Sequence, residues 1–184
     1  REPLASPDGT RQNRRAGRAR PRPMRILFVN QFYAPDESAT AELLAELAED
    51  LAAAGHEVAV VASRGRCEGG PPFPPHEQRR GVTVTRCPAT SLGKATTAAR
   101  MTDYLSFSLS GLATAALARR PDVMVALTTP PLLPATAAAV ARARGIPLVT
   151  WIQDVYPEVA ATLGALGPGS PAYRGFRASM RLAH

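Results

Sequence analysis

Segments with the pattern of buried strands alternate with helical segments, and this alternation constrains the fold more than any other feature. Residues 25–31 read R-I-L-F-V-N-Q, an apolar run ending in polar groups, which is typical of a strand covered on both faces of a parallel sheet. Residues 38–54 carry leucines and alanines at helical spacing. Ser38 can cap the start of that helix, and Gly55 suits a left-handed residue after its end.

The rest of the chain continues the alternation. It predicts an α/β fold with a Rossmann-like, doubly wound parallel sheet, in which ligands bind beyond the carboxyl ends of the strands. The Gly/Pro-rich segment 64–80 is predicted to be a loop. Further strands are predicted at Glu57–Ser63, Val82–Cys87, 122–127 and 146–152, and further helices at 96–119 and 131–144. The helix at 96–119 is expected to bury one face, made of Met101, Tyr104, Leu105, Leu109 and Leu112.

Two strand-end loops carry polar groups without a strong motif. The loop 30–40 lacks G-x-G-x-x-G, which argues against a dinucleotide site. It leads into a helix N-terminus that can bind a phosphate or a sugar through free N–H groups; alternatively, Ser38 and Thr40 only cap the helix. In the loop 128–133, two threonines precede two prolines.

The loop 153–158 gives the sharpest signal. Asp154 directly follows an apolar strand, where partial desolvation can perturb the pKa of a carboxylate and sharpen its hydrogen bonding. Glu158 is a second carboxylate four residues later. The alternative is that Asp154 caps a helix and Glu158 lies on a solvated face. The sequence shows no His–Cys pair, Ser–His–Asp triad or P-loop.

The net charge of +7 is concentrated at the start of the chain. Residues 1–23 hold seven arginines against Glu2 and Asp8, and the remainder is nearly balanced, so nucleic acid is not an expected partner. The composition of 1–23 predicts a disordered basic leader, followed by a domain at 24–170 and a truncated helix at 171–184. Cys67 and Cys87 lack metal-ligand spacing, which is typical of thiols in a reducing cytoplasm.

Several motifs, in this order, resemble one known family. They are M-R-I-L-F-V-N-Q-F-Y-A-P-D from Met24, L-A-A-A-G-H-E-V-A-V-V-A-S ending at Ser63, D-Y-L-S-F from Asp103, P-D-V-M-V-A-L-T-T-P-P from Pro121, and W-I-Q-D-V-Y-P-E from Trp151. The chain from Met24 to about Leu166 resembles family 4 glycosyltransferases, notably the colanic-acid and fucosamine-transferase-like group.

The resemblance implies the N-terminal half of a GT-B fold, which mainly holds the acceptor. It implies transfer of a sugar from a nucleotide-sugar donor with retention of configuration, usually without a metal and with no cofactor. Asp154 would be the catalytic residue that orients a hydroxyl, although many relatives carry a His near this position. The residues implied to bind substrate are Asn30, Tyr33, Thr40, Thr129, Gln153, Tyr156 and Glu158.

The resemblance also implies a glycan or polyprenyl-linked acceptor at the inner face of the plasma membrane, and hence a cytoplasmic, possibly peripheral protein. The segment 94–120 could lie on anionic lipid; alternatively, it is an ordinary core helix with basic ends. Because the nucleotide-binding half is missing, the 184 residues alone are expected to be inactive. The alternatives are half of a sugar-nucleotide epimerase and a non-catalytic module that binds a sugar or a partner protein.

Overall fold

The computed structural model describes residues 22–92, 96–153 and 174. Most of the leader at 1–23, the helix expected at 171–184 except residue 174, and the domain end near 170 lie outside these residues. In chain order the elements are β1 (Arg25–Val29), α1 (Ala39–Ala53), β2 (Glu57–Ser63), β3 (His76–Arg79), β4 (Val82–Cys87), α2 (Thr97–Leu117), β5 (Val123–Leu127), α3 (Leu133–Arg144) and β6 (Leu148–Trp151).

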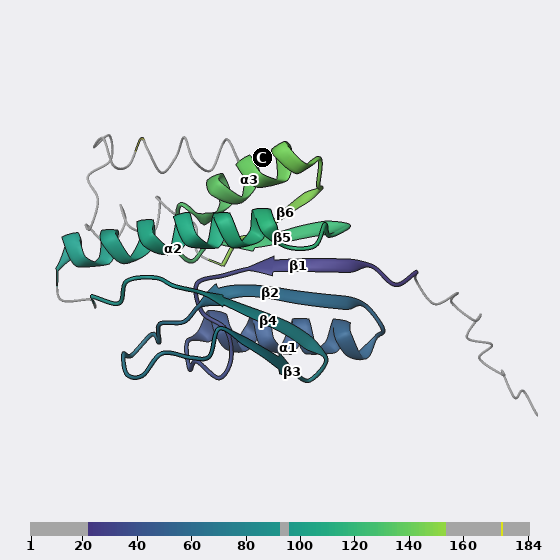
Figure 1. Cartoon of the computed structure of the whole chain (residues 1–184), viewed down its shortest axis with the longest axis horizontal. Coiled ribbons are helices and arrows are strands. Elements are labelled where there is room, and N and C mark those ends of the chain that lie inside the picture. Colours follow the sequence, from purple (N-terminus) through teal and green to yellow (C-terminus); the bar gives the residue numbers. More distant parts are fainter. Residues whose placement is uncertain (1–21, 93–95, 154–173, 175–184) are drawn as a thin grey trace, which may run out of the picture.

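The strands form one sheet in the order β3-β4-β2-β1-β5-β6 (Figure 1). All neighbouring pairs are parallel except β3 and β4. The strand order reverses direction between β1 and β5, which is the topological switch point where such sheets bind ligands. The predicted Rossmann-like α/β fold is therefore confirmed.

The prediction of an uninterrupted loop at 64–80 was wrong, because residues 76–79 form the antiparallel edge strand β3. A tight hairpin turn at Arg80 and Gly81, with φ of 44° and 84°, joins β3 to β4. Positive φ at both turn residues matches the right-handed twist of paired strands. The alternating polar pattern of β3 suits an edge strand with one face toward solvent.

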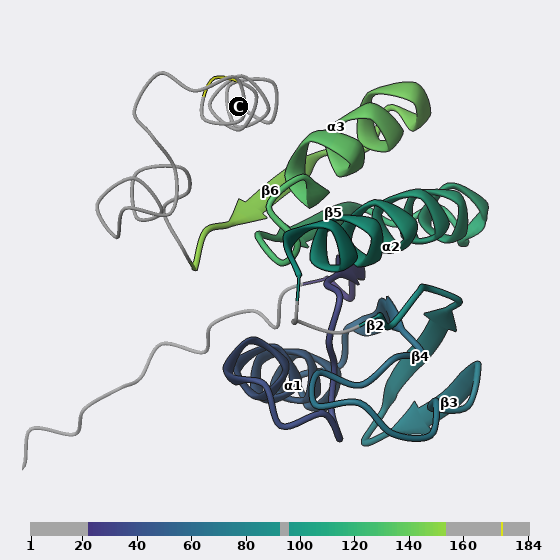
Figure 2. The same ribbon diagram turned by 90° about the vertical axis from the view of Figure 1, so that its left-hand side faces the viewer.

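Helices cover both faces of the sheet, with α1 on one face and α2 and α3 together on the other (Figure 2). Strand β1 supplies both cores: Phe28 packs on the side of α1, and Leu27 and Val29 pack on the side of α2 and α3. This double burial explains why the strand is continuously apolar. Ser38 caps α1 through the N–H of Ala41, and Gly55 follows the helix with φ of 97°, both as predicted.

The expected buried face of α2 was partly wrong. Leu105 and Leu109 are 48% and 66% exposed. The helix instead buries the face that carries Phe107, Gly111 and Ala115. Phe107 and Ala115 belong to the core cluster on this side of the sheet, and the missing side chain of Gly111 makes room for the ring of Phe107, which a Cβ there would meet at 3.3 Å. Leu105 and Leu109 lie outside this face.

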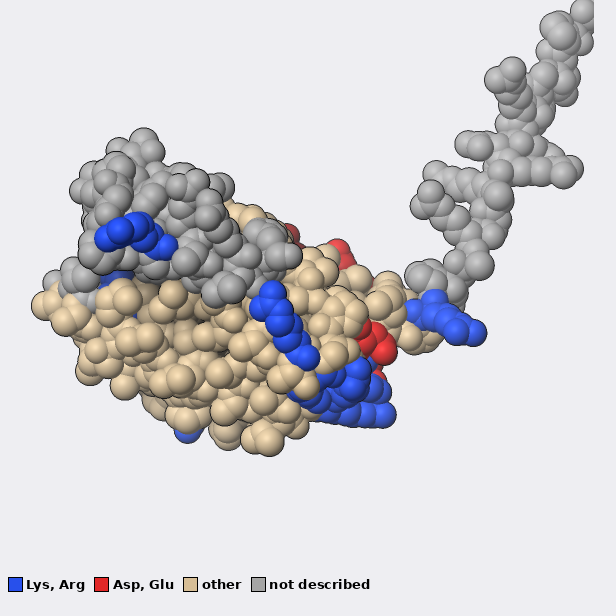
Figure 3. All heavy atoms as spheres, turned by 90° about the horizontal axis from the view of Figure 1, so that it is seen from above, with Lys and Arg blue, Asp and Glu red and all other residues tan. Residues whose placement is uncertain are grey.

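Seen from the side of α3, the described surface is mostly uncharged, with Lys and Arg gathered mainly toward one end (Figure 3). Among the described residues, no helix is long and apolar enough to cross a membrane.

Candidate functional site

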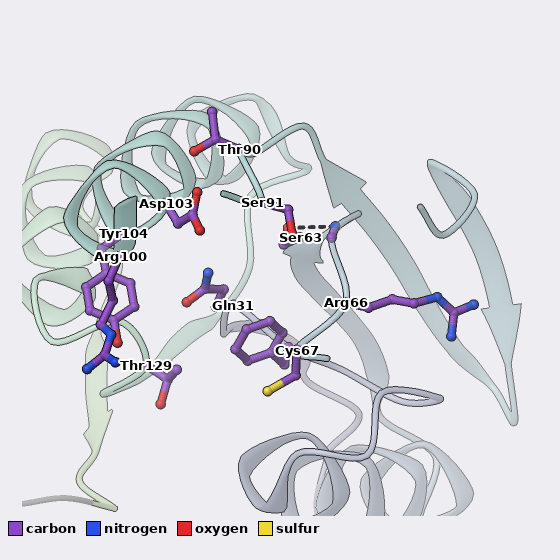
Figure 4. A pocket seen from close by; sticks show the side chains of 12 residues that line it. Gln31, Ser63, Arg66, Cys67, Thr90, Ser91, Arg100, Asp103, Tyr104 and Thr129 are labelled. Atoms are coloured by element: carbon purple, nitrogen blue, oxygen red, sulfur yellow. Dashed lines mark hydrogen bonds between the residues drawn. The ribbon is translucent and has the colours of Figure 1, made fainter. Parts of the chain in front are cut away.

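A pocket of about 290 Å³ opens at the carboxyl ends of β1, β2, β4 and β5, beside the first turns of α2 (Figure 4). We call it the strand-end pocket. It lies at the switch point of the sheet, where the fold rule places ligands. Its lining residues are Gln31, Phe32, Ser63, Gly65, Arg66, Cys67, Thr90, Ser91, Arg100, Asp103, Tyr104 and Thr129.

Gln31 lies at the floor of this pocket and has a fixed backbone. Its N–H donates to the carbonyl oxygen of Thr129 at 3.0 Å, and its own carbonyl accepts from the N–H of Ser63 at 2.9 Å. The residue is 5% exposed, and its buried side-chain oxygen Oε1 has no hydrogen-bond partner in the part of the chain that the structure describes. Figure 4 shows the amide inside the ring of lining side chains. A buried amide oxygen without a partner costs stability unless a ligand or water fills the gap.

Helix α2 positions the loop that follows β4. The carboxylate of Asp103 accepts the N–H of Leu92 at 3.0 Å to each oxygen. The hydroxyl of Ser106 accepts the N–H of Thr90 at 2.9 Å and lies 2.9 Å from the hydroxyl of the same threonine. Because these bonds hold the loop against the helix, the side chains of Thr90 and Ser91 stay at the pocket.

Asp36 joins the β1–α1 loop to the opposite wall of the pocket. Its carboxylate is 6% exposed and accepts two backbone N–H groups, from Ser38 at 3.1 Å and from Cys67 at 2.7 Å. Bonds from backbone N–H groups to a carboxylate are charge-assisted and comparatively strong. The wall is further shaped by the hydroxyl of Ser63, which accepts the N–H of Gly65 at 2.9 Å (Figure 4).

The buried guanidinium of Arg86 holds the β1–α1 loop through its main-chain carbonyls. Arg86 donates to the carbonyls of Ala34 at 2.6 Å and Tyr33 at 3.5 Å, and its nearest carboxylate oxygen is that of Glu77 at 3.5 Å. Burial lowers the pKa of Arg86, while Glu77 opposes that shift. The guanidinium also lies over the ring of Phe73 at 4.4 Å, a cation–π arrangement that partly replaces lost hydration.

Arg66 lines the pocket, but its side chain points away from the pocket centre (Figure 4). Its guanidinium lies over the same Phe73 ring at 4.0 Å, and its Nε donates to the carbonyl of Pro71 at 2.8 Å. The Phe73 ring thus contacts the guanidinium groups of both Arg66 and Arg86, and both contacts depend on the path of the loop between β2 and β3.

The residues predicted to bind substrate are not all brought together. Thr129 lines the pocket. Thr40 lies in the first turn of α1 with its hydroxyl 3.5 Å from that of Ser38, and it does not line the pocket. Gln153 donates its N–H to the hydroxyl of Thr128 at 3.3 Å, and its buried side-chain amide has no hydrogen-bond partner among the described residues. Asp154, Tyr156 and Glu158 lie outside the described residues.

Asn30 and Tyr33 are fully buried and do not line the pocket. The amide of Asn30 donates to the carbonyl of Phe32 at 2.7 Å and so shapes the loop. Tyr33 packs into the core under α1, and burial, the largest cause, raises its pKa to about 12. In this structure its side chain therefore belongs to the hydrophobic core and does not line the pocket.

Most of the pocket was missed from the sequence. Ser63 ends β2 and the Gly65–Cys67 stretch follows it, while Thr90 and Ser91 follow β4, so the same strand-end rule that selected three loops could have selected these two. Arg100, Asp103 and Tyr104 lie on one side of α2, three to four residues apart. Of these three residues, only Tyr104 belonged to the face that the sequence predicted to be buried.

The pocket combines the amide of Gln31, several hydroxyls, the carboxylate of Asp103 and the aromatic ring of Phe32, with Arg100 beside them on α2. Such groups bind and orient a polar ligand, whose hydroxyls both donate and accept hydrogen bonds. The described residues contain no group of His, Cys, Asp and Glu that could hold a metal ion.

The family described as glycosyl transferase 4-like domain matches residues 39–184. No curated protein matches the chain. The matched range includes the pocket walls from β2, β4, β5 and α2, and begins at the first residue of α1.

Proposed function

Because this chain belongs to the glycosyl transferase 4-like domain family, we propose that it is the acceptor-binding half of a retaining glycosyltransferase and that the strand-end pocket binds the acceptor sugar. The observation that carries the proposal is the pocket at the switch point, whose floor residue Gln31 has a buried, unpartnered amide oxygen. Its volume equals that of roughly ten water molecules at about 30 Å³ each, which suits one pyranose unit.

In this proposal, the donor is a nucleotide-sugar and the acceptor is a glycan, in the manner of the colanic-acid and fucosamine-transferase-like group. An acceptor hydroxyl oxygen forms a bond to the anomeric carbon, and the bond from that carbon to the donor phosphate breaks. The released phosphate takes the acceptor proton. The protein contributes positioning and charge stabilisation, with Asp154 as the residue that orients a reacting hydroxyl.

The acceptor in this proposal is linked to a polyprenyl lipid, and the protein works as a peripheral cytoplasmic enzyme. The outward face of α2 supports the lipid part, because Leu105 and Leu109 project one turn apart into solvent. Arg119 and Arg120 are exposed just beyond the helix end. An apolar stripe flanked by basic residues is the pattern that lies on anionic membrane surfaces.

Titration of the isotope-labelled chain with simple methyl pyranosides and, separately, with uridine diphosphate tests the assignment. Pyranosides are expected to shift backbone amide signals of the pocket, chiefly Gln31, Cys67 and Thr129, and the nucleotide is expected to leave them unchanged. Selective binding of the nucleotide in this pocket would overturn the assignment to the acceptor side. Binding of neither ligand at millimolar concentrations would overturn the pocket as a sugar site.

A further inference from the structure

The side-chain oxygen of Gln31 is the pocket atom that most restricts which ligand fits, because it is buried and lacks a hydrogen-bond donor among the described residues. Other polar groups at the pocket already have protein partners: the hydroxyl of Ser63 accepts from Gly65, and Asp103 accepts from Leu92. By contrast, Gln31 Oε1 is buried and has no partner. An unpaired acceptor in such a place is satisfied by a donor of the ligand, and it discriminates strongly against ligands that lack that donor.

The backbone of Gln31 cannot move to relieve this deficit. Its N–H and carbonyl continue the sheet on both sides of β1, toward Thr129 after β5 and Ser63 at the end of β2. The preceding residue, Asn30, donates its N–H to the carbonyl of Val61 at 3.1 Å. The side-chain amide is thus presented from a backbone that is bonded to both neighbouring strands, which favours recognition of a single, well-placed group.

Resting on the function proposed above, we propose that Gln31 is the specificity-determining residue of the strand-end pocket, where its side-chain oxygen accepts a hydrogen bond from one hydroxyl of an acceptor pyranose. The ligand class is a sugar unit that carries a free hydroxyl at that position. A sugar lacking it leaves the buried oxygen unpaired and binds more weakly.

The test combines ligand and protein variants. The methyl pyranoside that binds most tightly is compared with its monodeoxy and deoxyfluoro analogues, because fluorine occupies the place of a hydroxyl without donating a hydrogen bond. For the unmodified chain, one position is expected to lose affinity about tenfold in both analogues, in line with one buried hydrogen bond. The other positions are expected to lose less.

In Gln31→Met, the parent sugar is expected to bind about tenfold more weakly, and the penalty for the missing hydroxyl is expected to vanish. The matched control is Gln78→Met, which makes the same exchange on the exposed strand β3, where the Gln78 amide bonds Thr83 at 2.8 Å. This control should keep the full hydroxyl preference.

The outcomes separate the two proposals. If a pyranoside binds and the hydroxyl penalty in Gln31→Met equals that in the unmodified chain, Gln31 does not determine specificity, while the acceptor site stands. If no pyranoside shifts the pocket signals in the unmodified chain, the proposed function fails and this inference fails with it. Dispersed amide spectra for both variants establish that each is folded.

Discussion

The backbone N–H of Gln31 donates to the carbonyl of Thr129 at 3.0 Å across the point where the strand order of the sheet reverses. These two residues follow β1 and β5, which lie almost a hundred residues apart in the chain but pair side by side. The bond closes the floor of the strand-end pocket and leaves only the side chains of the two residues to face it. This arrangement makes separate predictions for stability and binding.

Replacement of Gln31 by Met should not destabilise the protein. The amide oxygen has no partner, so its removal eliminates a desolvation cost while the backbone bonds remain. We expect the free energy of unfolding to rise by about 1 kcal/mol, measured by urea denaturation without ligand. A fall of similar size would mean that the amide stabilises the empty pocket.

Loss of the buried cation should be severe. In Arg86→Met, the carbonyls of Tyr33 and Ala34 lose their donor and Glu77 loses its cation, so the free energy of unfolding should fall by about 3–5 kcal/mol. The matched control is Arg80→Met, which removes an ion pair to Glu49 from a side chain that is 74% exposed and should cost less than about 1 kcal/mol. Equal losses in urea denaturation would contradict the assigned role of Arg86.

Removal of the Asp36 carboxylate should loosen the pocket wall. In Asp36→Ala, the N–H groups of Ser38 and Cys67 lose a charged acceptor, at an expected cost of about 2–3 kcal/mol. The thiol of Cys67, which is partly exposed, should then react faster with iodoacetamide in the folded protein. Cys87 is buried and burial raises its pKa, so it should stay unreactive.

The control for this change is Glu37→Ala, which removes the neighbouring exposed carboxylate of the same loop. It should leave the reactivity of Cys67 as it is in the unmodified chain. An unchanged rate in Asp36→Ala would show that the loop keeps its path without this residue.

The tyrosine in the core should make stability fall at alkaline pH. Burial raises the pKa of Tyr33 from 10.0 to about 12, so the unfolded chain loses this proton first, and the free energy of unfolding falls as pH rises between these two values. In Tyr33→Phe this contribution disappears, which should flatten the decline by about 2 kcal/mol at pH 12 relative to the unmodified chain. Urea denaturation of both proteins across this pH range measures the difference; parallel curves would contradict it.

Association with anionic lipid should depend on one face of the molecule. Flotation with phosphatidylglycerol vesicles should carry the chain upward, and replacing both Leu105 and Leu109 by Ser should reduce the floated fraction several-fold. The control replaces Leu43 and Leu47 of α1, which are also exposed but lie on the other side of the sheet. Failure of the unmodified chain to float would remove the membrane proposal.

The sequence predicted five of the six strands because each is apolar enough to be buried in a sheet. Strand β3 was not predicted, because its residues H-E-Q-R carry no apolar pattern and its pairing depends on β4. The usable signal was the Arg80–Gly81 pair, a short turn before the alternating strand β4. In α2, the leucines suggested which face is buried, but the buried face carries Phe107, Gly111 and Ala115 instead.

The candidate site was less predictable than the fold. Thr129 was predicted to bind substrate and lies in the loop after a predicted strand. Gln31 was not among the predicted site residues, because it was assigned to the end of a predicted strand. Which strand ends become neighbours depends on sheet order, and pattern alone does not determine that order. The family resemblance implied that Tyr33 binds substrate, whereas in the structure its ring packs into the core under α1.

The hydrogen bond that joins Asp36 to the pocket wall is donated by the main-chain N–H of Cys67 and not by a side chain. Any residue except proline can supply this donor. A substitution of Cys67 can therefore change the side chain that lines the pocket while the wall keeps its attachment to Asp36. If the pocket binds the acceptor as proposed, its preference among acceptors can change there without remodelling of the backbone.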